Sequence, residues 1–440
     1  MRLQEPFESQ LKYATLSYCW GPALPLRTTS KTLADHKDGI PLHNMPQIDA
    51  LCIIQDSTED WETESVKMSD IFAYSFITIC AAASNSCSES FLKRSIDHSL
   101  IVPFQSSLRP EISGEYSIRL ERWSEYPEGS DIRFSKWRSR AWVWQEEVMA
   151  TRALMFGKSM LQFRCQEEIR AEDGHVKSPS LCLRKESTNE WFWSKAISDY
   201  SARDITFTRD RLSAISGIAK FMSNAFTEAR VPQKYLAGLW LGRSFEKQLR
   251  WVCNRPKFSY EMMASLWDKE VYFAPSWSWA SRNTGVDFLH FGGSTECQVV
   301  AHDLQPAETD ATVAVKFGSS ITVRGKLRQS PLTPLDGAFS SNADGLHNRW
   351  EVDSSEFGHF RFWLDWVPSV EASSERALQN RLQLLSTTWK LDKWRFSASG
   401  LLLTPFHWPI KPVYRRVGVF EVSGDLNWLM EAPDSDVTIM

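Results

Sequence analysis

The sequence contains no hydrophobic run long enough to cross a membrane. Its longest apolar stretch, Ile71 to Ala83, is interrupted by Tyr74, Ser75 and Thr78, whereas a membrane-spanning helix needs about 20 apolar residues. The first residues, MRLQEPFESQ, are polar and carry two glutamates, so they match neither a signal peptide nor a transit peptide. We therefore expect a cytoplasmic protein with no membrane span.

Paired cysteines are also absent. The eight cysteines are scattered, with no Cys-x-x-Cys pair and none of the regular spacing of a secreted disulfide scaffold, which fits a reducing cytosol. Cys165, His175 and Cys182 match no usual zinc-ligand spacing, so we predict no metal site. Cys19 and Cys52 lie in apolar runs, which favours buried thiols over catalytic nucleophiles.

A large charge of one sign is missing as well. The chain has 50 lysines plus arginines and 54 aspartates plus glutamates, a formal net charge of -4. Because no overall field attracts phosphate backbones, we expect no nucleic-acid partner. The sequence contains neither GxGxxG nor GxxxxGK followed by Ser or Thr, so neither the usual dinucleotide-binding turn nor a P-loop is supported. We predict no bound cofactor.

Tryptophan, in contrast, is abundant. The chain has 20 tryptophans among 440 residues, and its 42% hydrophobic and 24% charged content suits a multidomain globular protein. Most of the tryptophans stand beside apolar neighbours, which is typical of interdigitated core aromatics. We predict core packing for six of them: Trp142, Trp144, Trp191, Trp193, Trp277 and Trp279.

The N-terminal part alternates between strand-like and helix-like patterns. Residues 11–20 are rich in β-branched and aromatic types, and 48–54 is a second short apolar run that we interpret as a strand. After a capping residue at 56 or 57, apolar residues recur near helical period over 58–74, and 76–83 follows as a buried strand. Strand, helix and strand in this order predict an α/β fold with parallel strands and right-handed crossovers.

The rest of the chain divides by composition. We predict a first domain over 1–165, a polar linker over 166–190, a helical region over 191–256 and a β-rich region over 257–440. Helical spacing of apolar residues extends from Ala214 through Phe245. In the β-rich region a loop is expected at 330–346, and short strands are expected at 271–273, 312–315, 320–323, 360–366, 401–404 and 416–422.

Three blocks in the first domain carry a family resemblance. They are YATLSYCWG (13–21), IDALCIIQD (48–56) and SRAWVWQEE (139–147), in this order. Together they resemble the signature blocks of the fungal heterokaryon-incompatibility (HET) domain. Later segments, including YLAGLW (235–240) and APSWSWAS (274–281), are similar to those that commonly follow this domain. The resemblance implies a role in non-self recognition and regulated cell death.

The HET domain is regarded as a remote relative of the Toll/interleukin-1 receptor (TIR) domain, which implies a TIR-like or flavodoxin-like parallel sheet. Some TIR domains cleave NAD with a glutamate that lies on a helix four residues after a tryptophan, and Trp142 and Glu146 reproduce that spacing. The resemblance therefore implies Glu146 as the catalytic residue and NAD as a substrate. A carboxylate beside the ribose would suit the oxocarbenium-like transition state of that reaction.

Substrate-binding candidates come from the ends of the expected strands. In open α/β sheets ligands bind outside the carboxyl ends of the strands. The first two blocks would line one crevice only if their two strands are parallel neighbours, and in that case Tyr18, Trp20, Gly21, Asp49 and Gln55 are the binding candidates.

Two residues of the third block have alternative roles. Arg140 could bind a phosphate or pair with an acid such as Glu147 on its own helix. Trp142 could form an aromatic wall or pack the helix against the sheet.

One departure from the family pattern precedes the second block. HET domains usually place a full helix between an Ile-Pro-Leu…Leu-Pro segment and the Ile-Asp-x-Leu-Cys block, whereas here 39–47 runs directly into Ile48. The missing piece is on the order of 20 residues. A skipped exon or a decayed paralogue would produce the same gap, and the transcript would distinguish these cases.

Other interpretations remain open from the sequence. Glu146 sits in a Gln-Glu-Glu run and could be a solvated or ion-paired surface residue. In that case the HET domain would be a non-enzymatic module that assembles with copies of itself or with another incompatibility protein. A third interpretation is an inactive remnant with an incomplete HET domain.

Overall fold

The computed structural model describes most of the chain in two compact units, Met1–Ser187 and Thr188–Met440. The described residues are 12–21, 26–40, 49–93, 99–119, 130–179, 181, 183, 189–242, 244–289, 293–295, 297–305, 314–333, 338–340, 349–368, 381–392, 395–407 and 412–440. Each unit is treated by itself below. No helix among these residues is both long and apolar enough to span a bilayer.

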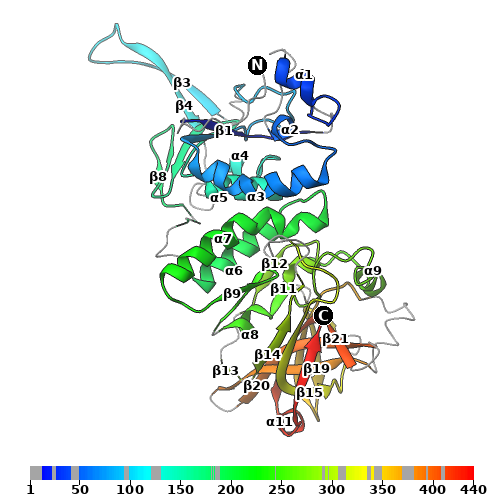
Figure 1. Ribbon diagram of the computed structural model, residues 1–440. Helices are drawn as coiled ribbons and strands as arrows, with labels where there is room; N and C mark the ends of the chain where they lie inside the picture. Colours follow the sequence, from blue (N-terminus) through cyan, green and yellow to red (C-terminus); the bar gives the residue numbers. More distant parts are fainter. Residues whose placement is uncertain are drawn as a thin grey trace. The chain divides into compact units, whose positions relative to one another are not determined.

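A six-stranded sheet forms the centre of the first unit, and its first half is parallel (Figure 1). Strands β1 (Ala14–Ser17), β2 (Ile77–Cys80) and β5 (Arg152–Phe156) run parallel to one another. The expected α/β class with a parallel N-terminal sheet is therefore confirmed. The remaining strands are antiparallel and extend the sheet in the order β6 (Leu161–Cys165), β7 (Ile169–Ala171) and β8 (Val176–Lys177).

Strands β7 and β8 lie in the segment 166–190, which we expected to be a linker. They pair in register with β6 and with each other. The charged residues and Gly174 between β7 and β8 therefore form a tight turn of the sheet and not a linker. The φ angle of Gly174 is 89°, a conformation that glycine adopts without cost.

The crossover from β1 to β2 is helical. It contains α1 (Leu33–Asp38), α2 (Asp49–Cys52) and α3 (Thr58–Tyr74). Helix α3 begins and ends at the predicted residues, and the Ser57 side chain caps it by accepting a hydrogen bond from the Asp60 N–H at 3.2 Å. Asp56, the other capping candidate, instead accepts hydrogen bonds from the backbone and side chain of Ser30.

The strand that we expected at 48–54 is wrong. Within the described residues, Asp49–Cys52 form a single helical turn. A short apolar run can be a buried strand or a buried helical turn, and neither its composition nor its length distinguishes the two. Of the segment 39–47, which departs from the family pattern, the described residues include only Gly39 and the buried Ile40. Ile48 also lies outside the described residues.

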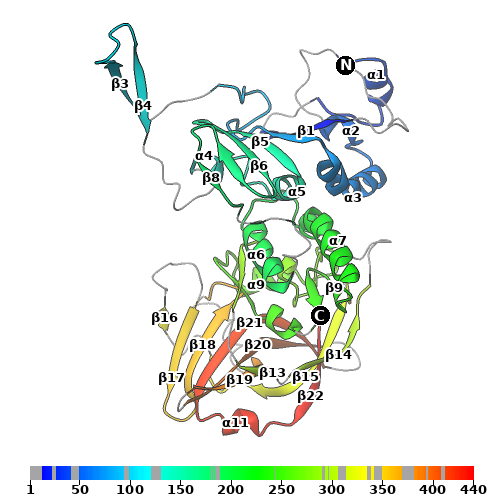
Figure 2. The same cartoon turned by 90° about the vertical axis from the view of Figure 1, so that its left-hand side faces the viewer.

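Between β2 and β5 the chain forms a hairpin and two helices. Strands β3 (Ser99–Gln105) and β4 (Ser113–Arg119) make a separate two-stranded sheet, and α4 (Ser130–Arg133) and α5 (Ala141–Met149) follow. Helix α5 lies beside α3 (Figures 1 and 2). The core of this unit joins α4 and α5 to the sheet through Cys19, Cys80, Ala82, Ile132, Trp137, Val143, Ala153 and Met155.

The second unit begins with helices α6 (Glu190–Ser201) and α7 (Ser213–Glu228), separated by the 3-10 helix η3 (Thr208–Arg211). The prediction that helical structure continues to Phe245 is wrong, because β9 (Lys234–Leu236) and β10 (Leu239–Leu241) form a hairpin there. Ala237 and Gly238 make its turn with φ angles of 43° and 95°. Short elements follow: α8 (Phe245–Gln248), β11 (Trp251–Cys253), α9 (Tyr260–Ser265), η4 (Trp279–Ser281) and β12 (Val286–Phe288).

The expected β-rich C-terminal region is confirmed as a ten-stranded, largely antiparallel sheet (Figure 2). Its elements are β13 (Ser294–Thr295), β14 (Gln298–Asp303), β15 (Ser320–Gln329), β16 (Ala338–Ser340), β17 (Arg349–Ser354), β18 (Gly358–Leu364), β19 (Gln383–Asp392), β20 (Arg395–His407), β21 (Pro412–Gly424), α11 (Asn427–Met430) and β22 (Asp434–Ile439). Strands β15, β22, β21, β20 and β19 pair in a closed circuit. The strand expected at 271–273 is a turn instead, and β16 lies within the loop expected at 330–346.

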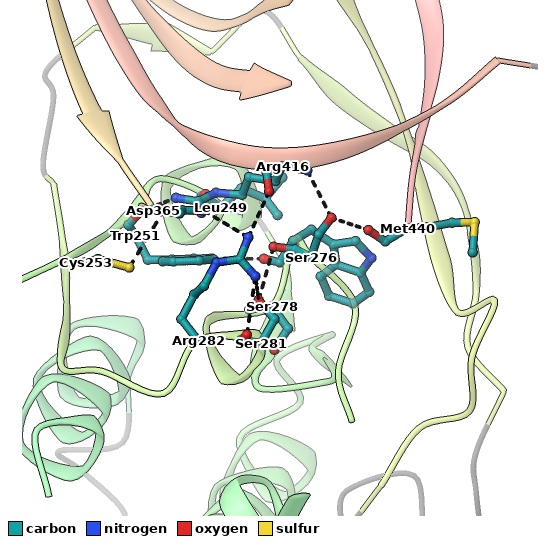
Figure 3. Close-up of polar contacts among 11 residues, drawn as sticks. Leu249, Trp251, Cys253, Ser276, Ser278, Ser281, Arg282, Asp365, Arg416 and Met440 are labelled. Atoms are coloured by element: carbon teal, nitrogen blue, oxygen red, sulfur yellow. Dashed lines mark hydrogen bonds and ion pairs between the residues drawn. The ribbon is translucent and has the colours of Figure 1, made fainter. Parts of the chain in front are cut away.

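A buried ion cluster fixes the Trp-rich segment of this unit (Figure 3). Arg416 Nη1 lies 2.5 Å from Asp365 Oδ2, and Arg282 Nη2 lies 3.4 Å from the same oxygen. Arg416 also donates to the carbonyl of Trp251, and its guanidinium carbon lies 3.3 Å from the centre of that indole ring. The Ser276 hydroxyl accepts from the Arg416 N–H at 3.0 Å and donates to the Met440 carbonyl.

Four of the six tryptophans predicted to lie in cores have no exposed surface. These are Trp144, Trp193, Trp277 and Trp279. Trp142 is half-buried, and the prediction is wrong for Trp191, which is 61% exposed with the Lys195 ammonium over its ring. Tryptophan therefore builds the cores of both units in this chain.

Candidate functional site

Helix α5 carries most of the third signature block, and it is buried on nearly every side. Eight of its nine residues, all except Trp142, are buried. Val143 packs in the core with residues from β2 and β5. The two acids Glu146 and Glu147 are therefore carried into the interior, and their exposed fractions are 7% and 3%. The sequence had left open a solvated Glu146, and the structure does not support that alternative.

The start of α5 is tied to the carboxyl end of β1. Arg140, which precedes the helix, donates from Nη1 to the carbonyl oxygen of Tyr18. Trp137 Nε1 donates to the Ser17 hydroxyl at 2.7 Å, and both residues are buried. The first and third blocks therefore meet where β1 ends. Arg140 thus holds the loop after β1, whereas two other arginines, Arg138 and Arg164, pair with Glu147.

The loops after β1 and β2 lie against each other. Cys87 N–H donates to the carbonyl of Trp20 at 3.4 Å, and Ala81 N–H donates to the carbonyl of Ser17 at 2.8 Å. Gly21 has a φ angle of 77°, and a Cβ atom at this position would stand 2.3 Å from the Cβ of Ser86. Glycine is therefore required at 21 both for its backbone conformation and for the close approach of the second loop.

The two acids of α5 have different environments. Glu147 Oε1 lies 3.0 Å from Arg138 Nη1 and 2.9 Å from Arg164 Nη1, and all three side chains are largely buried. This double ion pair joins the helix to the segment before it and to β6. Glu147 is therefore a structural anchor, because a buried carboxylate needs such compensation.

Glu146 lies near the end of β1. Burial raises the pKa of the Cys19 thiol, Arg140 and Lys136 lower it, and the negative charge of Glu146 raises it further. Burial likewise raises the pKa of Cys80 well above its ordinary value, and both Glu147 and Glu146 add to that rise. The two thiols stay protonated at neutral pH, which for Cys19 supports the expected buried structural thiol over a nucleophile. Glu146 is thus within electrostatic reach of the ends of both β1 and β2. The expectation of a buried thiol is wrong for Cys52, which is exposed.

The second block forms hydrogen bonds with the segment 26–40. The Gln55 N–H donates to the Thr28 carbonyl at 2.9 Å, and its side-chain amide donates to the Ile53 carbonyl at 3.1 Å. The Thr28 hydroxyl in turn donates to the Leu51 carbonyl at 2.6 Å. These bonds join the second block to the segment 26–40. Asp49 begins α2, and its side chain lies outside what the structure describes.

Trp142 contacts the crossover helix. Its ring meets that of Trp61 on α3 edge to face, with centroids 6.2 Å apart. Such aromatic pairs stabilise by about 1 kcal/mol beyond their buried area. Of the two roles considered for Trp142, this contact supports packing of α5 against its neighbour.

Sequence reasoning missed the three residues that fix Glu147 and the start of α5. Arg138 lies nine positions before Glu147 and Arg164 lies seventeen positions after it. These separations match neither helical nor strand periodicity, so no local pattern could reveal the pairing. Trp137 lies 120 residues from Ser17 in the chain, and only the fold brings the two together. Within the described part of the chain, no three His, Cys, Asp or Glu side chains gather to hold a metal ion.

Comparison with known proteins agrees with the signature blocks. The family model described as heterokaryon incompatibility protein (HET) matches residues 13–146, from the start of β1 to Glu146 in α5. No curated protein and no solved structure matches the chain significantly. Residues 13–146, which contain β1, β2, the helical crossover between them and the first six residues of α5, therefore form a HET domain.

Proposed function

We propose that this protein is an effector of regulated cell death in fungal heterokaryon incompatibility, and that its HET domain acts by hydrolysing NAD. The HET domain supports the incompatibility role itself. The observation that carries the enzymatic part is the position of Glu146. It lies one helical turn after Trp142 on a buried helix, near the ends of two parallel strands.

The two neighbouring acids divide their roles by their partners. Arg138 and Arg164 compensate the charge of Glu147 and hold it in place. The charge of Glu146 raises the pKa of Cys19 in the loop Tyr18–Gly21, and the first carbonyl of this loop accepts a hydrogen bond from Arg140. The proposed substrate site is therefore the region between α5 and this loop, with Trp20 and Gly21 as further candidates.

The proposed reaction breaks the bond between the ribose C1′ and the nicotinamide nitrogen. Nicotinamide leaves with the bonding electron pair, positive charge develops on the ribose, and water adds to C1′ with release of a proton. A carboxylate in a water-poor site stabilises such a developing cation strongly, because the surrounding dielectric is low. The low exposure of Glu146, 7%, provides such surroundings.

The test compares two single substitutions in adjacent residues. Purified full-length protein, oligomerised if necessary, is incubated with NAD, and released nicotinamide is measured by chromatography. Glu146→Gln should lower the rate by about 100-fold or more, since a positioned electrostatic group is lost. Glu147→Gln, which breaks the ion pairs with Arg138 and Arg164, should unfold at a lower temperature than the wild type.

Cell-death activity provides the second measurement. Expression of the wild-type chain should kill the host cell, and Glu146→Gln should not. Toxicity or NAD consumption that persists unchanged in Glu146→Gln would contradict the enzymatic proposal and favour a HET domain that signals by assembly alone.

A further inference from the structure

The hairpin β3–β4 stands apart from the main sheet of the first unit. Its two strands pair over seven residues, from Ser99 opposite Arg119 to Gln105 opposite Ser113. Among the described strands, each pairs only with the other (Figure 1). A two-stranded hairpin is at best marginally stable in water, and a third strand or a helix against its apolar face is normally required.

One face of the hairpin is apolar and exposed. Side chains alternate between the faces of a strand, so the even-numbered residues share one face. This face carries Leu100, Val102, Phe104, Tyr116 and Ile118, and the exposed fractions of Leu100, Tyr116 and Ile118 are 64%, 56% and 55%. Phe104 and Tyr116 stack across the strands with centroids 4.5 Å apart. A contiguous exposed patch of this kind indicates an interaction surface.

The two edges of the hairpin differ in their ability to pair. Ser106 N–H donates to the Ile112 carbonyl at 2.9 Å, so this pair is hydrogen bonded. Since hydrogen-bonded and non-hydrogen-bonded pairs alternate, the backbone groups of Pro103 and Glu115 point outward. Proline has no N–H, so the outer edge of β3 is interrupted at Pro103. The outer edge of β4 keeps the N–H groups of Glu115 and Ser117.

The sequence of β4 is complementary to itself when two copies run antiparallel. With Ser117 opposite Ser117 of a second copy, position 115, a glutamate, stands opposite position 119, an arginine. In the same register Tyr116 stands opposite Ile118. Each of these pairs occurs twice because of the two-fold symmetry. Opposite charges and aromatic–β-branched pairs are the cross-strand combinations that stabilise sheets.

We propose that two copies of this chain associate through β4, in antiparallel register about Ser117, to form a four-stranded sheet. The contact is isologous, as in most homodimers, and uses the edge that carries no proline. The outward N–H and carbonyl groups of Ser117 pair with those of Ser117 in the second copy, and those of Glu115 pair with the backbone groups of position 119. The apolar faces of both hairpins become one continuous face, and the exposed surface of Tyr116 and Ile118 decreases.

The test uses two prolines placed opposite each other in the hairpin. Ile101 and Ser117 form a non-hydrogen-bonded pair, so the N–H of each points outward and neither substitution breaks the hairpin's own ladder. By sedimentation equilibrium the full chain, 50.6 kDa as a monomer, should form a dimer. Ser117→Pro should raise the dimer Kd about tenfold or more, because two donors are lost across the axis. Ile101→Pro should leave the Kd unchanged.

A charge exchange tests the register independently of folding defects. Glu115→Arg and Arg119→Glu should each weaken the dimer, since like charges then face each other twice. The double variant Glu115→Arg with Arg119→Glu should restore the wild-type Kd within about threefold. A wild-type chain that stays monomeric, a dimer unaffected by Ser117→Pro, or a double variant as weak as the single ones would each overturn the proposal.

Discussion

Neighbouring residues in this chain have unrelated roles because their partners come from distant parts of the sequence. Glu147 is bound by two arginines, and Arg140 is bound to a backbone carbonyl 122 residues away. The types of residue in the third block were visible in the sequence, and their helical state could be predicted. Their partners could not, since a pairing between distant segments depends on the register of the whole sheet.

Gly21 allows a prediction at this scale. Gly21→Ala places a side chain at a φ angle of 77° and 2.3 Å from the Cβ of Ser86, so it should lower the free energy of unfolding by about 3 kcal/mol. Gly174 has a similar φ of 89° but no atom within 4 Å of an added Cβ, so Gly174→Ala should cost only about 1 kcal/mol. Urea unfolding of both variants measures the difference. Equal costs would show that the loop after β1 does not contact Ser86.

Asp210 allows a second prediction, of pH dependence. Burial raises the pKa of Asp210 to about 6, and Arg209, 3.9 Å away, opposes this shift only in part. The folded state therefore holds this proton up to about pH 6, whereas the unfolded chain releases it near pH 4. The stabilising contribution is complete below pH 4 and is lost as the pH rises to 6.

Asp210→Asn should remove this dependence, because the amide does not titrate. Above pH 6 the variant should be more stable than the wild type by about 2 kcal/mol, and below pH 4 the two should be equal. Denaturant unfolding at a series of pH values measures both curves. Parallel curves over pH 4 to 6 would mean that Asp210 is not buried as described.

Long elements with local signals at their ends could be predicted from the sequence, and short ones could not. Helix α3 was predicted residue by residue because apolar periodicity and a capping serine agree there. The hairpin β9–β10 was missed because its turn, Ala237-Gly238, lacks the usual Asn-Gly or Asp-Gly signal. Its position depends on tertiary contacts instead, since Trp193 and Trp279 both donate to the Gly238 carbonyl at 2.9 and 2.8 Å.

In the hairpin β3–β4 the apolar pattern of the sequence and the exposure of the side chains disagree. In β4 the apolar residues Tyr116 and Ile118 alternate with polar ones, the usual mark of a strand with one buried face, yet both side chains are exposed. Local pattern and local surroundings therefore disagree at this element. The proposed pairing with a second copy adds strands at the edge of β4 and lowers the exposure of Tyr116 and Ile118, but it does not cover the rest of the apolar face.

Each of the two units has its own buried ion cluster. In the first unit Glu147 pairs with Arg138 and Arg164, and in the second Asp365 pairs with Arg282 and Arg416. Burial lowers the pKa of Arg416, and Asp365 opposes that shift. Removing one partner of a buried pair leaves an uncompensated charge, which costs about 3–5 kcal/mol of stability.

Substitutions in these two clusters test whether the compact units 1–187 and 188–440 unfold separately. Calorimetry of the full chain should then show two transitions. Glu147→Gln should lower one by about 10 °C and Asp365→Asn should lower the other by about as much, because about 3 kcal/mol is lost in each case. Glu64→Gln, which breaks the exposed pair with Lys67, should move neither by more than about 3 °C. A single transition that responds to both buried substitutions would mean that the 440 residues unfold as one cooperative structure.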